Sequence, residues 1–255
     1  MRYEVLGPLR VVHDGLPFSV GGHKVETLLT VLLARAGQLV THDQLMSEMW
    51  GERPPRRATA GLHVYVSQLR KFLQRSGRTD SPVVTRPAGY LLELGPDELD
   101  AHRFLELAGR GRAEIRELRH DAASETLSAA LGLWRGQVLD DLRPGPILEG
   151  YVTSLMETRI ECEELLIEAR LHLGRHRELI SPLYALTACN PLREALYHHL
   201  MLALYRSGRA ADALQVFQSV RRLLHRELGL EPCRQLQDLQ RAILSADRLL
   251  DRRAA

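Results

Sequence analysis

The sequence predicts a mainly α-helical protein with a small β-sheet region near its N-terminus, and three observations support this fold class. The 255-residue chain is 45% hydrophobic and carries 34 Lys+Arg against 32 Asp+Glu, the balance of a globular protein with one or two cores. Aromatic residues make up only 5% of it, which favours helices packed through aliphatic stripes over a large β-sandwich. Apolar residues alternate at period two near the N-terminus and again before residue 95, whereas most other segments show helical spacing.

The first 37 residues predict a short antiparallel meander followed by a helix. Alternating strands are expected at residues 2–6, 9–13 and 17–20. Asp14-Gly15 is a turn signal between the second and third of these strands. In residues 24–36 leucine and valine recur at helical spacing, and Gly37 is expected to end that helix.

Two further helices are predicted before residue 76. Thr41 and Gln44 have the spacing of a capping box, which opens a helix over residues 41–50. The polar loop GERPPRR then leads into a strongly amphipathic helix over residues 57–75. The apolar stripe of this helix consists of Leu62, Tyr65, Val66, Leu69, Phe72 and Leu73.

The next segment has the pattern of a β-hairpin. Residues 82–94 form two apolar alternating runs around Pro87-Ala88-Gly89. Three helices followed by a two-stranded wing predict a winged helix-turn-helix domain over residues 1–95.

Positive charge is concentrated in this first domain. Residues 1–95 hold 12 Lys+Arg against 8 Asp+Glu (+4), whereas residues 96–255 hold 22 against 24 (−2). The window of residues 53–86 contains eight cations and a single acid, Asp80. The cations are Arg53, Arg56, Arg57, Arg70, Lys71, Arg75, Arg78 and Arg86. This charge predicts contact with nucleic acid phosphates, although an exposed basic helix without a partner would carry the same charge.

The face of the third helix opposite its apolar stripe favours the nucleic-acid interpretation. At 100° per residue, this face has small or hydrogen-bonding side chains at its centre and cations at its rim. The central residues are Ala60, Val64, Ser67 and Lys71, flanked by Arg56, His63, Gln68 and Arg70. Such a face permits close approach to base edges and anchoring to phosphates.

The second half predicts an all-α domain of tetratricopeptide-like repeats over residues 98–255. Gly174 and Gly208 are 34 residues apart, which is the tetratricopeptide period. The same offset superposes Ala169 on Ala203, Arg175 on Arg209, Glu178 on Asp212 and Leu183 on Phe217, with Pro191 and Pro232 closing the units. An earlier unit is expected around residues 121–136. Stacked repeats of this kind bind peptides or proteins, or serve only as a spacer.

The sequence offers no catalytic, cofactor or metal site. It contains neither GxxxxGK[ST] nor GxGxxG, so no phosphate cradle is expected. His172 and His176 have the i, i+4 spacing of a zinc pair, but no third ligand is evident, and we interpret them as surface histidines. His198-His199 form no constellation, and the glutamates at 161, 163 and 164 are expected to form a solvated acidic face. An enzyme is therefore not predicted.

The compartment expected from the sequence is the cytoplasm, in association with the nucleoid. Three scattered cysteines at positions 162, 189 and 233 form no CxxC pair, which is typical of a reducing compartment. Neither a signal peptide nor an uncharged apolar stretch of 18 residues is recognisable.

Several runs of the chain resemble one family over essentially its whole length. They are RPPRRATAGLHVYVSQLRKFL, PAGYLLEL, LWRG, ALYRSGRAADAL and ELGLEP. The combination resembles the Streptomyces antibiotic regulatory protein (SARP) family of transcription activators, in which an OmpR-type winged helix precedes a bacterial transcriptional activation domain. One departure matters: OmpR-type relatives usually have arginines at the positions of Ser67 and Gln68, so their base contacts cannot be carried over.

The resemblance implies a set of DNA-contacting residues. Phosphates would be held by Trp50, Tyr65 and Arg70; the major groove would be faced by Ala60, Gly61, Val64, Ser67 and Gln68; and Arg86 would enter the minor groove. Charge and position add Arg56, Arg57, His63 and Lys71 to this set.

The resemblance also implies a role and partners. The chain would be a pathway-specific activator of an antibiotic or other secondary-metabolite gene cluster that binds double-stranded promoter DNA. It would bind direct repeats near the −35 region as a homodimer and recruit RNA polymerase holoenzyme, with Glu52 and Arg53 facing the sigma subunit. The alternative is a helical-repeat interaction scaffold without specific DNA readout.

Overall fold

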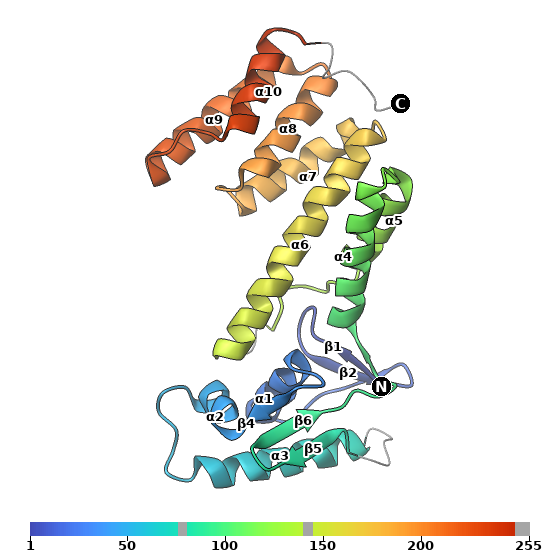
Figure 1. Cartoon of the computed structure of the whole chain (residues 1–255), viewed down its shortest axis with the longest axis vertical. Coiled ribbons are helices and arrows are strands. Elements are labelled where there is room, and N and C mark those ends of the chain that lie inside the picture. Colours follow the sequence, from blue (N-terminus) through green and yellow to red (C-terminus); the bar gives the residue numbers. More distant parts are fainter. Residues whose placement is uncertain (76–80, 140–144, 248–255) are drawn as a thin grey trace. The chain divides into compact units, whose positions relative to one another are not determined.

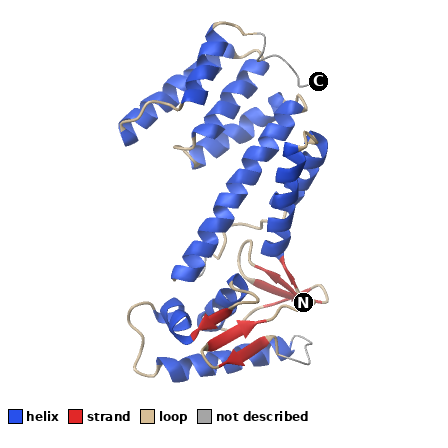
Figure 2. Cartoon of the chain, viewed as in Figure 1, coloured by secondary structure: helices blue, strands red, loops and turns tan. Residues whose placement is uncertain are grey.

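The computed structural model describes residues 1–75, 81–139 and 145–247, which are mostly helical (Figures 1 and 2). The chain forms two compact units, one of residues 1–107 with 129–159 and the other of 108–128 with 160–255. Helices α4 (Asp100–Arg116) and α6 (Pro146–His172) contribute residues to both units. Because neither unit is continuous in sequence, the domain boundary at residues 95–98 stays a prediction.

The first unit begins with a four-stranded sheet in the order β3-β2-β1-β7. The strands are β1 (Arg2–Glu4), β2 (Arg10–His13), β3 (Leu16–Phe18) and β7 (Glu98–Leu99). The predicted meander is confirmed: β1, β2 and β3 pair antiparallel, and Asp14 and Gly15 turn between the last two with φ of 49° and 78°. The sequence did not predict β7, which pairs parallel with β1 from a distant part of the chain.

Three helices follow at the expected places: α1 (His23–Ala34), α2 (His42–Trp50) and α3 (Ala58–Arg75). The capping box at the start of α2 is confirmed. The Gln44 backbone N–H donates to the Thr41 hydroxyl over 3.2 Å, and the Thr41 N–H donates to the Gln44 side chain over 2.9 Å. Apolar side chains of the three helices form the core between them; these include Leu28, Leu29, Leu32, Leu45, Leu62, Leu69 and Leu73, each fully buried.

The wing belongs to a sheet of three strands rather than the two expected. Strands β5 (Val83–Arg86) and β6 (Gly89–Leu92) form the predicted hairpin, and β4 (Leu39–Thr41) pairs with the other side of β6. The order β4-β6-β5 leaves β5 at the edge. Gly89 is required here, because a Cβ at this position would lie 2.0 Å from the Val40 carbonyl oxygen.

The chain after the wing packs back onto the first sheet within the same unit. The buried Asp100 carboxylate accepts the backbone N–H groups of Val5 (2.8 Å) and Leu6 (3.1 Å). Burial raises the pKa of Asp100, and these two hydrogen bonds oppose that shift. Arg135 donates its backbone N–H to the Leu6 carbonyl and its guanidinium to the Pro8 carbonyl. Residues outside the predicted DNA-binding domain thus stabilise its first sheet.

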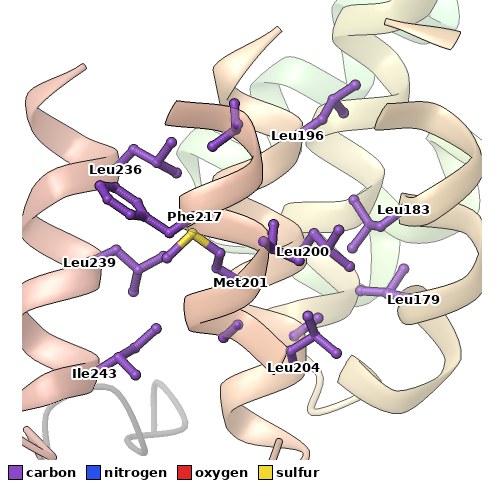
Figure 3. Close-up of a cluster of buried hydrophobic side chains, with 14 of the residues drawn as sticks. Leu179, Leu183, Leu196, Leu200, Met201, Leu204, Phe217, Leu236, Leu239 and Ile243 are labelled. Carbon is purple, nitrogen blue, oxygen red and sulfur yellow. The ribbon is translucent and has the colours of Figure 1, made fainter. Parts of the chain in front are cut away.

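The second unit contains the rest of the helices. Its complete helices are α7 (His176–Cys189), α8 (Glu194–Arg206), α9 (Ala210–Leu228) and α10 (Arg234–Leu244). It also holds most of α5 (His120–Leu131), whose last residues belong to the first unit. Side chains from α7 to α10 interlock in one apolar cluster (Figure 3). In that cluster Met201 and Leu204 of α8 lie between Leu179 of α7 and Leu239 of α10.

The 34-residue repeat is confirmed by matching local geometry. Gly174 and Gly208 both follow a helix with φ of 76° and 78°, a conformation that favours glycine. The superposed pairs also match: Ala169 and Ala203 are fully buried, and Leu183 and Phe217 both enter the cluster. At the two turns, Arg175 pairs with Glu178 at 2.7 Å and Arg209 pairs with Asp212 at 2.6 Å.

The structure shows the surroundings of the four histidines that the sequence singled out. His172 is half-buried at the end of α6 and stacks on His120 with ring centroids 4.2 Å apart and planes 3° apart. His176 begins the next helix and has a buried Nδ1, so the pair does not share a helix face. His198 and His199 are in contact edge to face, and burial lowers the pKa of both, that of His199 to about 4.

The expected acidic face of α6 is only partly solvated, because tertiary packing brings arginines to it. Glu161 accepts from Arg112 of α4 at 2.6 and 2.8 Å, and Glu164 accepts from Arg193 at 2.6 Å. The neighbouring guanidinium lowers the pKa of Glu161.

A search of the described helices for membrane spans found no candidate, since none combines the necessary length with sufficient hydrophobicity.

Candidate nucleic-acid interface

Helix α3 separates an apolar face from an exposed polar face. Leu62, Val66, Leu69 and Leu73 are buried, while Tyr65 and Phe72 of the predicted stripe are half-buried. The predicted contact residues that are exposed on or just before the helix are Arg56, Arg57, Ala60, His63, Val64, Ser67, Gln68 and Lys71. Val64 is 53% exposed, which is unusual for a valine inside an ordered helix. The structure therefore brings most of the predicted residues to one accessible surface.

The electrostatics of this surface follow from its composition. No acid occurs in the sequence from Arg53 to Arg78, so the cations of this segment have no carboxylate neighbour along the chain. Arg78 and Asp80 lie outside the described residues. Within the described part of the chain no group of three or more histidine, cysteine or acidic residues is placed to hold a metal ion.

Trp50 and Tyr65 lie together at the junction of α2 and α3. Their ring centroids are 6.2 Å apart, and both side chains are half-buried. Gly61 lies beneath them, since a Cβ there would be 3.5 Å from the Trp50 ring. Gly61 thus packs against the indole rather than standing on the open face with Ala60. Half-buried aromatic side chains with polar edges suit contact with a phosphate backbone at the end of a helix.

Lys24 completes this junction and was not among the predicted residues. Its ammonium donates to the Met49 carbonyl at the end of α2 and lies 5.6 Å from the centre of the Trp50 ring. Burial lowers the pKa of Lys24. A cation over an indole face orients the ring. Composition could have drawn attention to Lys24, because it is one of only two lysines among the 34 basic residues of the sequence.

Arg70 is directed at the wing. Its Nε and Nη2 donate to the Val83 carbonyl over 3.1 and 2.8 Å, and Nη2 also donates to the Thr85 hydroxyl over 2.7 Å. Arg70 is only half-buried, but much of its donor capacity is used inside the protein. Thr85 was not predicted, and nothing local in the sequence indicates this long-range contact.

The wing tip carries the remaining predicted cation. Arg86 is exposed at the end of β5, opposite Gly89 in the hairpin register. Near it, His42 contacts the rings of Tyr90 and His63, with centroids 5.4 and 6.4 Å apart. Ring contacts therefore connect the start of α2 with the wing and with the exposed face of α3.

The loop between α2 and α3 is exposed throughout residues 51–57. Glu52 and Arg53 stand in it ahead of Pro54 and Pro55, and the Pro55 carbonyl accepts the Ala58 N–H over 2.9 Å at the start of α3. The prolines limit the backbone of the loop while its charges face solvent.

Two family models match the chain. Residues 22–92 match the C-terminal domain of transcriptional regulatory proteins, and residues 99–244 match the bacterial transcriptional activator domain. Regulatory protein DnrI of Streptomyces peucetius is 37% identical over 99% of this chain and 95% of its own length. The chain belongs to the SARP family of transcriptional activators. The family models and the named relatives are transcriptional regulators rather than enzymes.

Other family members are longer. Regulatory protein AfsR of Streptomyces coelicolor is 41% identical over 97% of this chain, which spans only 24% of AfsR. A solved structure of Mycobacterium tuberculosis EmbR in complex with a low-affinity phosphopeptide matches with a TM-score of 0.91 and 36% identity, covering 96% of this chain and 65% of the EmbR chain. The fold of this chain is thus shared with a mycobacterial regulator of known structure.

Proposed function

We propose that this chain is a sequence-specific DNA-binding activator that reads double-stranded promoter DNA with α3 and the wing. The observation that carries the proposal is the exposed, acid-free face of α3, with small and hydrogen-bonding side chains at its centre and cations at its rim. Short central side chains let the helix approach the floor of the major groove, and the cations release counterions from phosphates.

Within this face the residues divide by chemistry. Ser67 and Gln68 are exposed hydrogen-bonding groups and are assigned to base reading. Arg56, Arg57 and Lys71 are assigned to phosphates, with Trp50 and Tyr65 beside them. A Gln68→Ala variant should lose preference at one base pair, at a cost of about 1–3 kcal/mol for a good contact. An unchanged consensus site in a selection experiment would remove Gln68 from base reading.

The proposal is tested by titrating labelled promoter DNA and bulk DNA with the full chain across a series of salt concentrations. Binding should weaken about linearly in log salt, with tighter binding to the promoter of the controlled cluster than to bulk DNA. A protein that showed neither property would instead be the helical-repeat scaffold. Lys71→Ala should flatten the slope by about one unit for the lost phosphate contact.

We further assign two protomers side by side on direct repeats near the −35 region. The support is the family membership, together with the small length of DNA that a single recognition helix covers. Inverting one half-site should abolish tight binding, whereas an inverted site that still binds tightly would indicate a two-fold symmetric dimer.

Activation is assigned to the loop between α2 and α3, where Glu52 and Arg53 would meet RNA polymerase holoenzyme at its sigma subunit. A variant with both residues replaced by alanine keeps Pro54 and Pro55, so the loop backbone should persist. We expect near-normal promoter affinity with reduced transcription in a purified polymerase assay. Wild-type transcription would transfer the polymerase contact to another surface, with the helical repeats as the next candidate.

The SARP membership supports a site of action in the cytoplasm, at the nucleoid, on the genes of one secondary-metabolite pathway. Footprinting on the gene cluster adjacent to the coding sequence would identify that target directly. Protection restricted to unrelated promoters would contradict the pathway assignment.

A further inference from the structure

Arg70 connects α3, the proposed recognition helix, with the wing through hydrogen bonds from two of its guanidinium nitrogens. Two nitrogens of its guanidinium donate to the Val83 carbonyl, at 3.1 and 2.8 Å, and one of them also donates to the Thr85 hydroxyl at 2.7 Å. Both acceptors belong to β5, which is the edge strand of the β4-β6-β5 sheet. The contact therefore joins α3 to the side of β5 on which the described residues place no strand.

The wing needs such a contact for a physical reason. Strand β6 pairs with β4 on one side and β5 on the other, whereas the four-residue β5 has β6 as its one partner in this sheet. A carbonyl on an edge strand also lacks a ladder partner. A guanidinium supplies charge-assisted hydrogen bonds from a rigid planar group, so it fixes distance and orientation together.

Arg86 follows Thr85 directly in β5 and stands exposed at the wing tip. Whatever fixes Thr85 relative to α3 therefore sets the spacing between the recognition helix and the wing-tip cation. We infer that Arg70 is a positioning residue that holds the wing at a fixed distance from α3, so that both engage one DNA site without an ordering cost on binding. This inference rests on the proposed function, and it gives Arg70 a different role from the phosphate contact implied by family resemblance.

The test is a double-mutant cycle in the full chain, with affinity for promoter DNA measured at one salt concentration. Arg70→Ala and Arg86→Ala should each weaken promoter binding about tenfold. The double variant should bind within about threefold of the single variant that has the lower affinity, because the effects of residues that act through one another do not add. The matched control is Lys71→Ala with Arg86→Ala. Lys71 is an exposed cation on the same helix, so those two losses should multiply. Multiplying losses for Arg70 and Arg86 would overturn the inference.

Two substitutions of Thr85 test the same contact in case Arg70→Ala does not fold. Thr85→Val removes the acceptor hydroxyl and keeps the β-branched shape, whereas Thr85→Ser keeps the hydroxyl. Thr85→Val should weaken promoter binding about threefold, only in the background that retains Arg86, and Thr85→Ser should bind like the wild type. Equal affinities of the Val and Ser variants would overturn the inference.

A measurement without DNA separates this inference from the proposed function. Amide hydrogen exchange of residues 83–92 should accelerate at least tenfold in Arg70→Ala and remain unchanged in Lys71→Ala, while exchange in α1 stays at the wild-type rate. Unchanged exchange in the hairpin would show that Arg70 does not hold the wing. Failure of the wild-type chain to prefer promoter DNA would refute the proposed function but leave this measurement valid.

Discussion

Arginines serve opposite purposes in the α3 region and in the repeats. On α3 and the loop before it, exposed cations occupy a segment without acids from Arg53 to Arg78. In the second compact unit, which contains the repeats, arginines pair with carboxylates. Such pairs join Arg112 to Glu161, Arg193 to Glu164, Arg209 to Asp212 and Arg221 to Glu231. The same residue type therefore stands without acidic neighbours along the chain in one region and pairs with carboxylates in the other.

The difference teaches that the local balance of charge, and not the total, indicates a nucleic-acid surface. The whole chain carries a formal charge of only +2. An ion pair has no net charge, so its field falls off faster with distance than that of a single cation. A segment rich in cations and without acids is therefore expected to contribute most of the positive field, which salt screens over about 8 Å at physiological ionic strength.

The largest effect is expected from removing cations of the α3 region. Arg56→Ala combined with Arg57→Ala should reduce promoter affinity about a hundredfold at low salt and flatten the log-salt slope by about two units. The control is Arg175→Ala combined with Arg209→Ala, which removes the same charge from two repeat turns. Equal slopes for the two double variants would break the distinction between the regions.

A second effect concerns His199, whose pKa burial lowers to about 4 from an ordinary 6.5. Between these values the unfolded chain binds a proton that the folded chain excludes, so this stability is present above pH 6.5 and is lost as pH falls. From pH 7 to pH 5 the free energy of unfolding in urea should fall by about 2 kcal/mol more in the wild type than in His199→Gln, in which the neighbouring His198 still titrates. Parallel pH dependence in both proteins would mean that His199 is protonated when folded.

A smaller effect is expected for a paired arginine. Arg112→Ala should lower the free energy of unfolding by at most about 1 kcal/mol, because both partners are partly exposed and solvent screens the pair. Since Arg112 lowers the pKa of Glu161, the difference from the wild type should vanish as pH falls below the ordinary carboxyl range. DNA affinity at neutral pH should not change, and a flattened salt slope would assign Arg112 to the DNA surface.

The smallest effect is expected at the repeat turns. Arg175 and Glu178 form an i, i+3 pair of exposed side chains at this turn. Arg175→Ala should leave the unfolding midpoint unchanged within error, because exposed pairs of this kind add little to stability. Gly174→Ala at the same turn is the sensitive control, since its φ of 76° disfavours a side chain. A midpoint that shifts in both variants would show that the ion pair does hold the turn.

Local patterns were sufficient for most elements but not for strand pairing. Helical spacing located α1, α2 and α3, and the Thr41 capping box marks the start of α2. Strand β4 was missed because three residues give too short a run to show a period, and its partner β6 lies 50 residues away. The same limit applies to the two-residue β7.

At the candidate nucleic-acid interface too, exposure could be predicted from the sequence and contacts between elements could not. The amphipathicity of α3 alone identified which side chains would be exposed, since period and polarity are local properties. It did not reveal that Gly61 lies against Trp50, that Lys24 lies over the same ring, or that Arg70 bonds to β5. Each of these contacts joins two elements, and no periodicity records a partner in another element.

By itself the sequence determined the first three helices, the helical character and 34-residue repeat of the second half, the acid-free basic segment and the family. These follow from order along the chain, where spacing and charge can be counted directly. Only the tertiary structure decided which charges are neutralised, such as Glu161 by Arg112, and which histidines are in contact, such as His172 stacked on His120. The physical reason is that burial and ion pairing depend on distances between segments remote in sequence, and folding alone brings those segments together.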